Sequence, residues 1–360
     1  MVLAFSCNGI TKVTDAITNP SAREVYAREF KGNESAFGIW DTAYKSAIAD
    51  SLTVSLPYGE AGTFNPADTT AYSYVFDLQE GEMLLANVKK DSPDRVFINV
   101  FGQEESGFKE MESNTLHSPA LTFVPKQSGK YKIVIQSEMG SQSDFVITLN
   151  KKPLYTAFPV AGKGNAAIGS FWGVDRDGGS RKHEGIDIFA KRGTPVVAIA
   201  DGAITYSGEK GIGGKQVWLR DSTYGSSLYY AHLDSIAVTS GSRVHVGDTL
   251  GFVGNTGNAK FTPSHLHFGI YRNFGAVNPL PFVHENTIIT SRDFAKNFKD
   301  PVLKIKSQVA NLRQQPDAKA PKLAELKVNE KVVLLGEGKE WLHIKTATNL
   351  RAFLHKSLVK

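Results

Sequence analysis

The chain has 360 residues, which at roughly 100–200 residues per domain favours two or three domains. Apolar residues make up 41% of the chain and charged residues 21%, a composition that excludes a disordered protein. The net charge of +5 permits a polyanionic partner, but no known nucleic-acid-reading motif accompanies it, so no nucleic-acid partner is expected. No apolar stretch reaches the about 18 residues of a membrane-spanning helix, and the single cysteine, Cys7, excludes an internal disulfide and a thiolate zinc site.

The lone cysteine follows a run of apolar and small residues that begins at Met1. The run resembles the end of a bacterial lipoprotein signal, in which Cys7 would become the lipidated first residue. It is too short for a whole signal, so an ordinary cysteine near the terminus is the alternative. The resemblance implies attachment to a membrane through Cys7 and a location in the bacterial cell envelope, either periplasmic or anchored as a lipoprotein.

Residues 8–50 are predicted to be helical. Asn19 before Pro20 is typical of a helix start, with Asn as the cap and Pro in the first turn, and Gly32 is a plausible stop. A stripe of apolar residues at helical spacing predicts a packing surface rather than a ligand site: Phe37, Trp40, Tyr44 and Ile48.

Residues 51–150 change to an alternating period, with turn residues at roughly ten-residue spacing, which is typical of an antiparallel β-sandwich. The predicted strands are 52–56, 72–78, 83–88, 95–101, 130–135 and 144–149. The segment resembles the pre-peptidase β domains of secreted bacterial proteases, and no residue in it points to chemistry.

Residues 151–290 are rich in glycine and carry histidines in short motifs. His183 and Asp187 lie four residues apart in a stretch that looks like a strand, which would place both on one face with Gly185 between them. A metal ion fits such a gap, because zinc binds His nitrogen and Asp oxygen at about 2.0–2.2 Å. Taken alone, this spacing is more often a surface ion pair.

Two further strands strengthen the metal interpretation. His265 and His267 alternate with apolar residues and would share one face, and His232 lies in an apolar strand where it needs a hydrogen-bonding partner or a metal. If the strands are antiparallel neighbours, five polar groups converge. A catalytic zinc site takes three protein ligands and leaves one open position, so two imidazoles would remain for acid–base chemistry.

The stretch from Phe158 to Pro279 resembles the lysostaphin-type (LytM-type) zinc metallopeptidases that cut peptidoglycan peptides. The resemblance rests on motifs in family order: His183-Glu184-Gly185-Ile186-Asp187-Ile188, Gly193-Thr194-Pro195-Val196, Ala200-Asp201-Gly202, Tyr230-Ala231-His232-Leu233, Val246-Gly247-Asp248, Gly254-Asn255-Thr256-Gly257 and His265-Leu266-His267-Phe268. It implies one zinc ion per chain held by His183, Asp187 and His267. It also implies that His232 and His265 are the catalytic imidazoles.

By this resemblance, zinc would polarise the scissile carbonyl and acidify a water molecule, and His265 or His232 would take a proton and return it to the leaving amine. The family often has a group upstream of the first ligand that holds the oxyanion. Arg176 or Trp172 could serve, although a plain rim loop is the simpler interpretation. The other histidines show no ligand spacing and are interpreted as ordinary residues: His117, His245, His284, His343 and His355.

Residues 300–360 contain evenly spaced short strands and resemble the bacterial Src-homology-3-like domain. That family has Asn-Val-Arg near its start and Gly-Trp-Val near its end. Here the first motif is Asn311-Leu312-Arg313 and the second is replaced by Ala352-Phe353-Leu354. These departures leave the ligand open. A wall-targeting module with few contacts across its boundary is expected.

The sequence therefore predicts a mainly β, multidomain protein. Its parts are a lipoprotein-like start with a helical segment (1–50), an antiparallel sandwich (51–150), an antiparallel β peptidase domain (151–290) and a small C-terminal β-barrel (300–360). The predicted function is a zinc endopeptidase acting on peptidoglycan. The alternatives are a non-catalytic regulator of other wall hydrolases and a wall-binding adaptor. The sequence makes no prediction of the oligomeric state.

Overall fold

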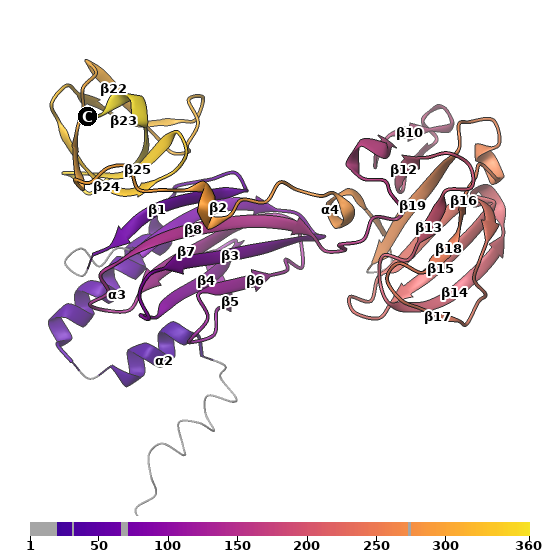
Figure 1. Cartoon of the computed structure of the whole chain (residues 1–360), viewed down its shortest axis with the longest axis horizontal. Helices are drawn as coiled ribbons and strands as arrows, with labels where there is room; N and C mark the ends of the chain where they lie inside the picture. The colour runs from indigo at the N-terminus through magenta and orange to yellow at the C-terminus, as the bar shows by residue number, and fades with distance from the viewer. Residues whose placement is uncertain (1–19, 31, 66–70, 273–274) are drawn as a thin grey trace, which may run out of the picture.

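The computed structural model describes residues 20–30, 32–65, 71–272 and 275–360. Figure 1 shows a central sandwich with two helices on its lower side, a small C-terminal module above one end and a separate β unit beyond the other end. The prediction of a mainly β, multidomain protein is confirmed. Cys7 lies outside the described residues, and so does the lipidation prediction. None of the helices in the described part of the chain has the length and apolarity needed to span a bilayer.

Two helices, α2 (Ala22–Glu29) and α3 (Glu34–Ala49), follow Pro20. The predicted start at Asn19 with Pro20 in the first turn is wrong, because Ser21 is the cap and exchanges hydrogen bonds with Glu24 in a capping box. Trp40 and Tyr44 of the predicted stripe are buried against the sandwich, and the Trp40 indole donates to the Ser137 carbonyl at 2.9 Å. The stripe is therefore a packing surface, as expected.

The sandwich consists of two antiparallel sheets that face each other across a shared apolar core. Its strands are β1 (Tyr58–Phe64), β2 (Ala71–Leu78), β3 (Glu82–Lys90), β4 (Val96–Glu104), β5 (Gly107–Ser113), β6 (Ala120–Phe123), β7 (Gly129–Ser137) and β8 (Ser143–Pro153). One sheet has the order β1-β8-β3-β6 and the other β2-β7-β4-β5. The predicted strand 52–56 is wrong. Only Thr53 forms a bridge there, while the missed strand β1 contains two glycines and a buried Glu60 that hide its alternation.

The unit beyond the other end of the sandwich holds the histidine motifs (Figure 1). Its strands are β9 (Ile168–Ser170), β10 (Asp175–Arg176), β11 (Arg181–Lys182), β12 (Ile186–Phe189), β13 (Pro195–Val197), β14 (Gly202–Glu209), β15 (Lys215–Asp221), β16 (Ser227–Ile236), β17 (Arg243–Val244), β18 (Thr249–Val253), β19 (His265–Arg272) and β20 (Gly275–Val277). The main sheet has the order β17-β14-β15-β16-β19-β12-β9. As expected, the strands that carry Asp187, His232 and His267 are antiparallel neighbours.

The C-terminal strands are β21 (Val302–Lys304), β22 (Val309–Arg313), β23 (Lys322–Lys327), β24 (Lys331–Glu337), β25 (Trp341–Thr346) and β26 (Arg351–His355). Their hydrogen-bonded order is open. It runs β23-β22-β26-β25-β24 and continues from β24 onto β1 of the sandwich, where Ala61 pairs with Glu337. The expectation of a closed barrel is therefore wrong for this ladder.

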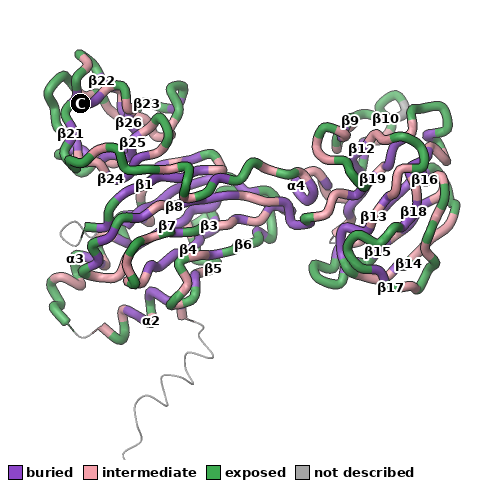
Figure 2. Tube along the Cα trace, viewed as in Figure 1, coloured by how far each residue is buried: buried purple, intermediate pink, exposed green. Residues whose placement is uncertain are grey.

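The expectation of a boundary with few contacts is also wrong. Leu335 and Phe353 belong to the same buried core as the sandwich strands, and the Tyr72 hydroxyl donates to the Leu335 carbonyl at 3.1 Å. Figure 2 shows β24 of the module lying beside β1 of the sandwich, and both strands contain buried residues. The C-terminal module and the sandwich thus share one sheet, and the module adds Leu335 and Phe353 to the sandwich core while keeping a core of its own.

The histidine-bearing unit is an insertion between these two parts. The chain enters it from β8 and leaves it through the short helix α4 (Leu280–Val283). It then returns along the sandwich, where the Asn150 side chain exchanges hydrogen bonds with the backbone of Ile289. Arg272 of the unit also forms an ion pair with Glu80 of the sandwich at 2.9 Å. Both ends of the inserted unit are therefore tied to the same body.

Candidate metal centre

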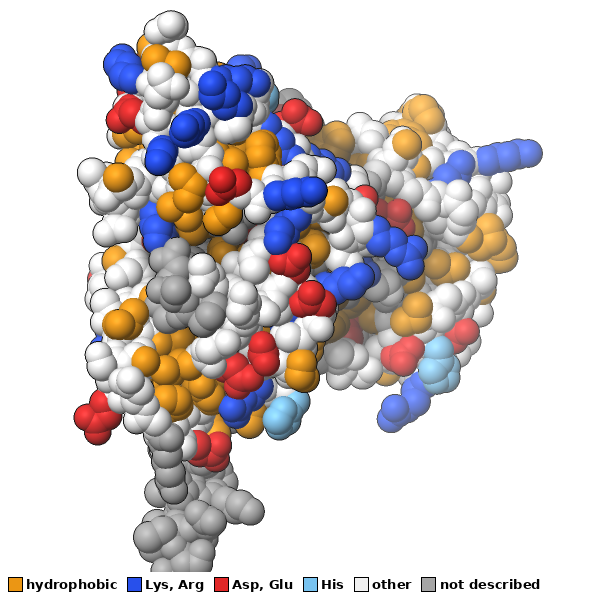
Figure 3. Space-filling model, turned by 60° about the vertical axis from the view of Figure 1, so that its left-hand side comes forward, with side chains coloured by type: hydrophobic (Ala, Val, Ile, Leu, Met, Phe, Trp, Pro, Cys, Tyr) orange, Lys and Arg blue, Asp and Glu red, His pale blue; other side chains and the backbone are white. Residues whose placement is uncertain are grey.

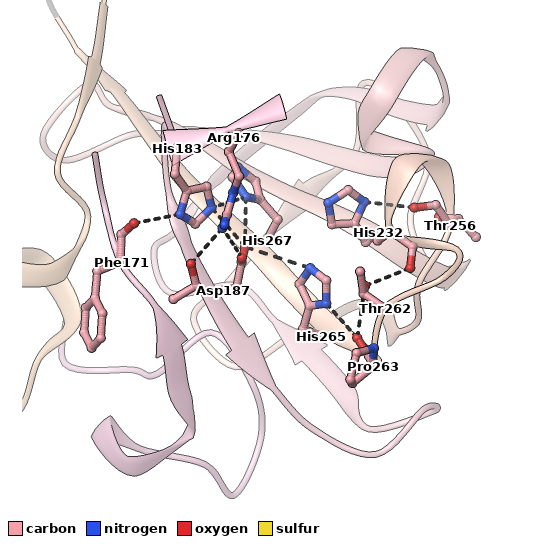
Figure 4. A network of polar contacts seen from close by, with 12 residues as sticks. Phe171, Arg176, His183, Asp187, His232, Thr256, Thr262, Pro263, His265 and His267 are labelled. Carbon is pink, nitrogen blue, oxygen red and sulfur yellow. Dashed lines mark hydrogen bonds and ion pairs between the residues drawn. The ribbon is translucent and has the colours of Figure 1, made fainter. Parts of the chain in front are cut away.

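The pairing of β12 with β19 builds one wall of the site. Asp187 lies directly opposite His267 in this antiparallel ladder, and the flanking Ile186, Leu266 and Phe268 are fully buried on the other face. Strand alternation therefore turns the apolar side chains into the core and the carboxylate and imidazole towards a groove of about 680 Å³. Figure 4 shows these side chains converging.

His183 reaches the same point from the chain segment before β12. The predicted strand that includes His183 is wrong in its start, because β12 begins at Ile186. The backbone N–H of His183 donates to the Val174 carbonyl at 2.8 Å. Its ring Nδ1 lies 2.8 Å from the Phe171 carbonyl, and since a carbonyl only accepts, Nδ1 carries the proton. Nε2 faces Asp187 and is the ring atom that a metal ion could use.

Three donor atoms form a compact triangle. His183 Nε2 lies 3.0 Å from Asp187 Oδ1 and 3.0 Å from His267 Nδ1, and His267 Nδ1 lies 3.1 Å from Asp187 Oδ1. Donors placed about 2.0 Å from a tetrahedral centre are about 3.3 Å apart, so a metal ion fits after a small outward shift. Among the described residues, these three side chains form a group with metal-ligand spacing.

The charge of Asp187 suits this role. Burial alone would raise the pKa of its carboxyl, but hydrogen bonds and charges from His183 and His267 outweigh burial and hold the pKa far below the usual range. Burial lowers the pKa of His267. The group therefore presents one carboxylate and two imidazoles, which is the donor set expected of a zinc site.

His265 and His232 lie beside the triangle. His265 Nδ1 is 2.8 Å from the Pro263 carbonyl and His232 Nδ1 is 2.9 Å from the Thr256 carbonyl, so both rings hold their proton on Nδ1 and turn Nε2 to the groove (Figure 4). His265 Nε2 lies 3.9 Å from Asp187 Oδ1. The two rings are 5.2 Å apart between centroids. Each can accept a proton at Nε2 in the same space.

His232 has an uncommon backbone conformation, with φ of 62°. The register of β16 against β15 shifts next to it, which is the mark of a bulge that redirects a side chain. Burial lowers the pKa of His232 to about 4, with further lowering by His267 and His265. At neutral pH this imidazole is therefore neutral, and the strained turn directs its free nitrogen into the groove.

Gly185, which directly precedes β12, leaves no room for an added atom beside the His267 ring. A Cβ there would lie 2.6 Å from His267 Cε1 and 2.6 Å from the Phe268 carbonyl oxygen. We expect Gly185→Ala to displace the His267 ring and to weaken zinc binding by at least about tenfold, the lower range for a disturbed ligand surrounding. Competition with a chromogenic chelator measures this loss. Gly275→Ala, where a Cβ meets open space, is the matched control and should bind zinc as the wild type does.

Of the two residues proposed to hold the oxyanion, only one lies in the groove. Arg176 lines the groove and forms an ion pair with Asp187, whereas Trp172 does not line it. The other histidines also lie outside the groove: His117, His245, His284, His343 and His355. His343 is fully buried against Glu60, a contact that the sequence analysis missed because the two residues are far apart in the chain.

A groove with a carboxylate and two imidazoles at ligand spacing, and two more imidazoles beside them, is the arrangement of a mononuclear metallohydrolase. Residues 181–279 match the model of peptidase family M23, and residues 308–360 match the model of the bacterial SH3 domain. The chain therefore carries an M23 peptidase domain followed by a bacterial SH3 domain.

Two curated relatives and one solved structure illustrate the similarity. The DD-carboxypeptidase/endopeptidase Mpg of Neisseria meningitidis is 41% identical over 115 residues, which cover 32% of this chain and 26% of the relative. The L-Ala–D-Glu endopeptidase of Bacillus subtilis is 37% identical over 129 residues, which cover 33% of this chain and 39% of the relative. The catalytic domain of lysostaphin from Staphylococcus simulans is 34% identical, covering 32% of this chain and 89% of that chain, with a TM-score of 0.29. The matched part thus spans about a quarter to two fifths of the curated relatives' length.

Proposed function

We propose that this protein is a zinc metalloendopeptidase that hydrolyses peptide bonds in the stem peptides or cross-links of peptidoglycan. The observation that carries the proposal is the triangle of His183, Asp187 and His267 with two further imidazoles in one groove. The M23 match over residues 181–279 and the endopeptidase names of the relatives support the same activity.

Zinc is the proposed metal because the donors are two imidazole nitrogens and one carboxylate oxygen with no thiolate. One zinc ion per chain would be held by His183, Asp187 and His267. Bound there, zinc supplies a Lewis acid that polarises a carbonyl and increases the acidity of water.

His265 and His232 are proposed to move the protons of the reaction. Their Nδ1 atoms face carbonyl oxygens, so Nε2 is the atom of each ring that can accept a proton from the attacking water. The same ring, once protonated, can donate to the leaving amine, which otherwise departs as a poor leaving group. The Pro263 and Thr256 carbonyls hold the two rings in the orientation that this exchange needs.

The C-terminal module supports a wall partner. Residues 300–360 hold twelve Lys and Arg against six Asp and Glu, so this segment is more positive than the whole chain with its +5. Lys and Arg side chains outnumber acidic ones at the upper end of Figure 3, where this module lies. We propose that the module binds the anionic cell wall and that the protein acts in the bacterial cell envelope. Attachment through a lipidated Cys7 and a pre-peptidase role of residues 51–150 remain proposals from the sequence.

Two other functions would use the same fold. A regulator of other wall hydrolases would need the groove only as a surface, and an adaptor would need only the C-terminal module. The five polar groups of the groove favour catalysis over both, because a binding surface has no use for two imidazoles with free Nε2 atoms beside a ligand triangle.

The test is digestion of purified peptidoglycan with the full chain, followed by mass analysis of the released peptides. We expect chelator-sensitive release of peptides with new amino termini, restored by added zinc. His265→Ala should keep the zinc but slow release by at least about 10²-fold, the usual size of an acid–base contribution. Binding to the wall without release, by a protein that holds zinc, would contradict the enzyme and favour the adaptor.

A further inference from the structure

Asp187 uses its two carboxylate oxygens for two different purposes. Oδ1 faces the imidazoles of His183 and His267 at 3.0 and 3.1 Å. Oδ2 instead accepts a hydrogen bond from Arg176 Nη2 at 2.7 Å. The Asp187 side chain is only 10% exposed and that of Arg176 27%, so this ion pair is largely shielded from water. Figure 4 shows the guanidinium reaching into the ligand group.

The guanidinium of Arg176 is fixed by a second partner. The same Nη2 lies 2.7 Å from Ser170 Oγ. Ser170 is the residue directly opposite Asp187 in the pairing of β9 with β12, so the hydroxyl and the carboxylate flank one position. Arg176 therefore cannot follow a rotation of the Asp187 carboxylate without losing the Ser170 contact.

The backbone that carries Arg176 is tied to another residue of the triangle. Arg176 lies in the β10–β11 hairpin, and this hairpin is continued by two hydrogen bonds at His183: from His183 N to the Val174 carbonyl at 2.8 Å, and from Gly173 N to the His183 carbonyl at 2.9 Å. The Phe171 carbonyl, from the same segment, orients the His183 ring. A single short segment thus restrains both His183 and Asp187.

We propose that Arg176 is a positioning residue, which holds Oδ2 of Asp187 so that Oδ1 remains the atom offered to a metal ion. Without the guanidinium, the carboxylate is free to turn about its Cβ–Cγ bond, and its second oxygen loses its charged partner. Outer contacts of this kind typically change metal affinity by about 10- to 100-fold. The inference rests on the metal site of the proposed function.

The experiment measures zinc affinity of the full chain by competition with a chromogenic chelator. Arg176→Gln should weaken binding by about 10- to 100-fold. Arg176→Lys should restore part of the loss, because an ammonium keeps the charge but lacks the flat fork of donors that a guanidinium offers. Arg192→Gln is the control, since it breaks another arginine–aspartate pair, with Asp234, on an exposed surface outside the groove.

A double-variant cycle tests whether Ser170 affects zinc binding through Arg176. Ser170→Ala should weaken zinc binding less than Arg176→Gln does. The double variant should bind no worse than Arg176→Gln alone, because Ser170 acts through the guanidinium. Additive losses would overturn this coupling. Thermal unfolding of the metal-free variants checks that each folds as Arg192→Gln does.

Three outcomes separate the inference from the function. If Asp187→Ala loses zinc but Arg176→Gln keeps wild-type affinity, the positioning role is wrong while the metal site stands. If Arg176→Gln keeps zinc and loses only turnover, the arginine contacts the substrate instead. If Asp187→Ala itself binds zinc as the wild type does, the proposed metal site fails.

Discussion

Asp187→Ala is expected to remove both the metal and the hydrolytic activity. The carboxylate is the only anionic donor of the triangle, and both imidazoles lie within 3.1 Å of its Oδ1. Removing it leaves two neutral ligands, which is one fewer than the three protein ligands of a catalytic zinc site. Zinc affinity should fall by more than the loss of about 10- to 100-fold that follows when an outer contact is removed.

Elemental analysis of the purified variant measures the zinc, and peptidoglycan digestion measures the activity. Asp187→Asn tests charge separately from shape, and it should also fail to hold zinc at stoichiometric occupancy. Asp234→Asn is the matched control, because the Asp234 carboxylate pairs with the exposed Arg192 and lies outside the groove. Full zinc occupancy in Asp187→Ala would remove Asp187 from the ligand set.

The sequence predicts the histidines and the aspartate of the site, but it does not predict the contacts that hold them in place. The alternation of His265 and His267 with apolar residues indicates two imidazoles on one strand face, and the structure brings both into the groove with His183, Asp187 and His232. Arg176 was one of two candidates upstream of His183. Its contact with Asp187 depends on how the β10–β11 hairpin folds over β9 and β12, and no periodicity encodes that placement.

The fold shows the same division. Strands with clean alternation, such as β2 and β7, were predictable, whereas β1 was missed because glycines and a buried carboxylate break its apolar pattern. The joint between β1 and β24 was also missed. It unites segments more than 270 residues apart, so the sequence of neither strand shows its partner.

That joint contains a buried polar cluster, defined here as Tyr58, Glu60, Tyr74 and His343. Glu60 and its partners are buried, and the carboxylate accepts hydrogen bonds from the hydroxyls of Tyr58 at 2.6 Å and Tyr74 at 2.5 Å. His343 Nδ1, from the C-terminal module, lies 3.4 Å from the same carboxylate. The cluster therefore links the sandwich to the module through one charged group.

The pKa of Glu60 indicates that the cluster favours its ionised form. Burial raises this pKa, but the charge and hydrogen bond of His343 and the two tyrosine hydroxyls outweigh burial, and the net shift is downward. A carboxyl whose pKa is lower in the folded state stabilises the fold above its unfolded pKa of about 4.3. That contribution is lost as the pH falls through the folded value, so the joint should weaken in acid.

Glu60→Gln is expected to destabilise the body formed by the sandwich and the C-terminal module by about 1–3 kcal/mol, the cost of leaving a buried hydrogen-bonding group without its partner. The neutral amide offers one acceptor oxygen to two tyrosine hydroxyls and no charge to His343. Calorimetry should show the unfolding transition of this body at a lower temperature. The transition of the inserted histidine-bearing unit, whose core is separate, should stay in place.

The matched control is Glu105→Gln, which removes an exposed charge from the turn between β4 and β5. The Glu60 variant should also lose less stability below about pH 4.3 than the wild type does, because its amide does not titrate. Equal transitions for the two variants would mean that the joint is held by its shared core and strand pairing alone.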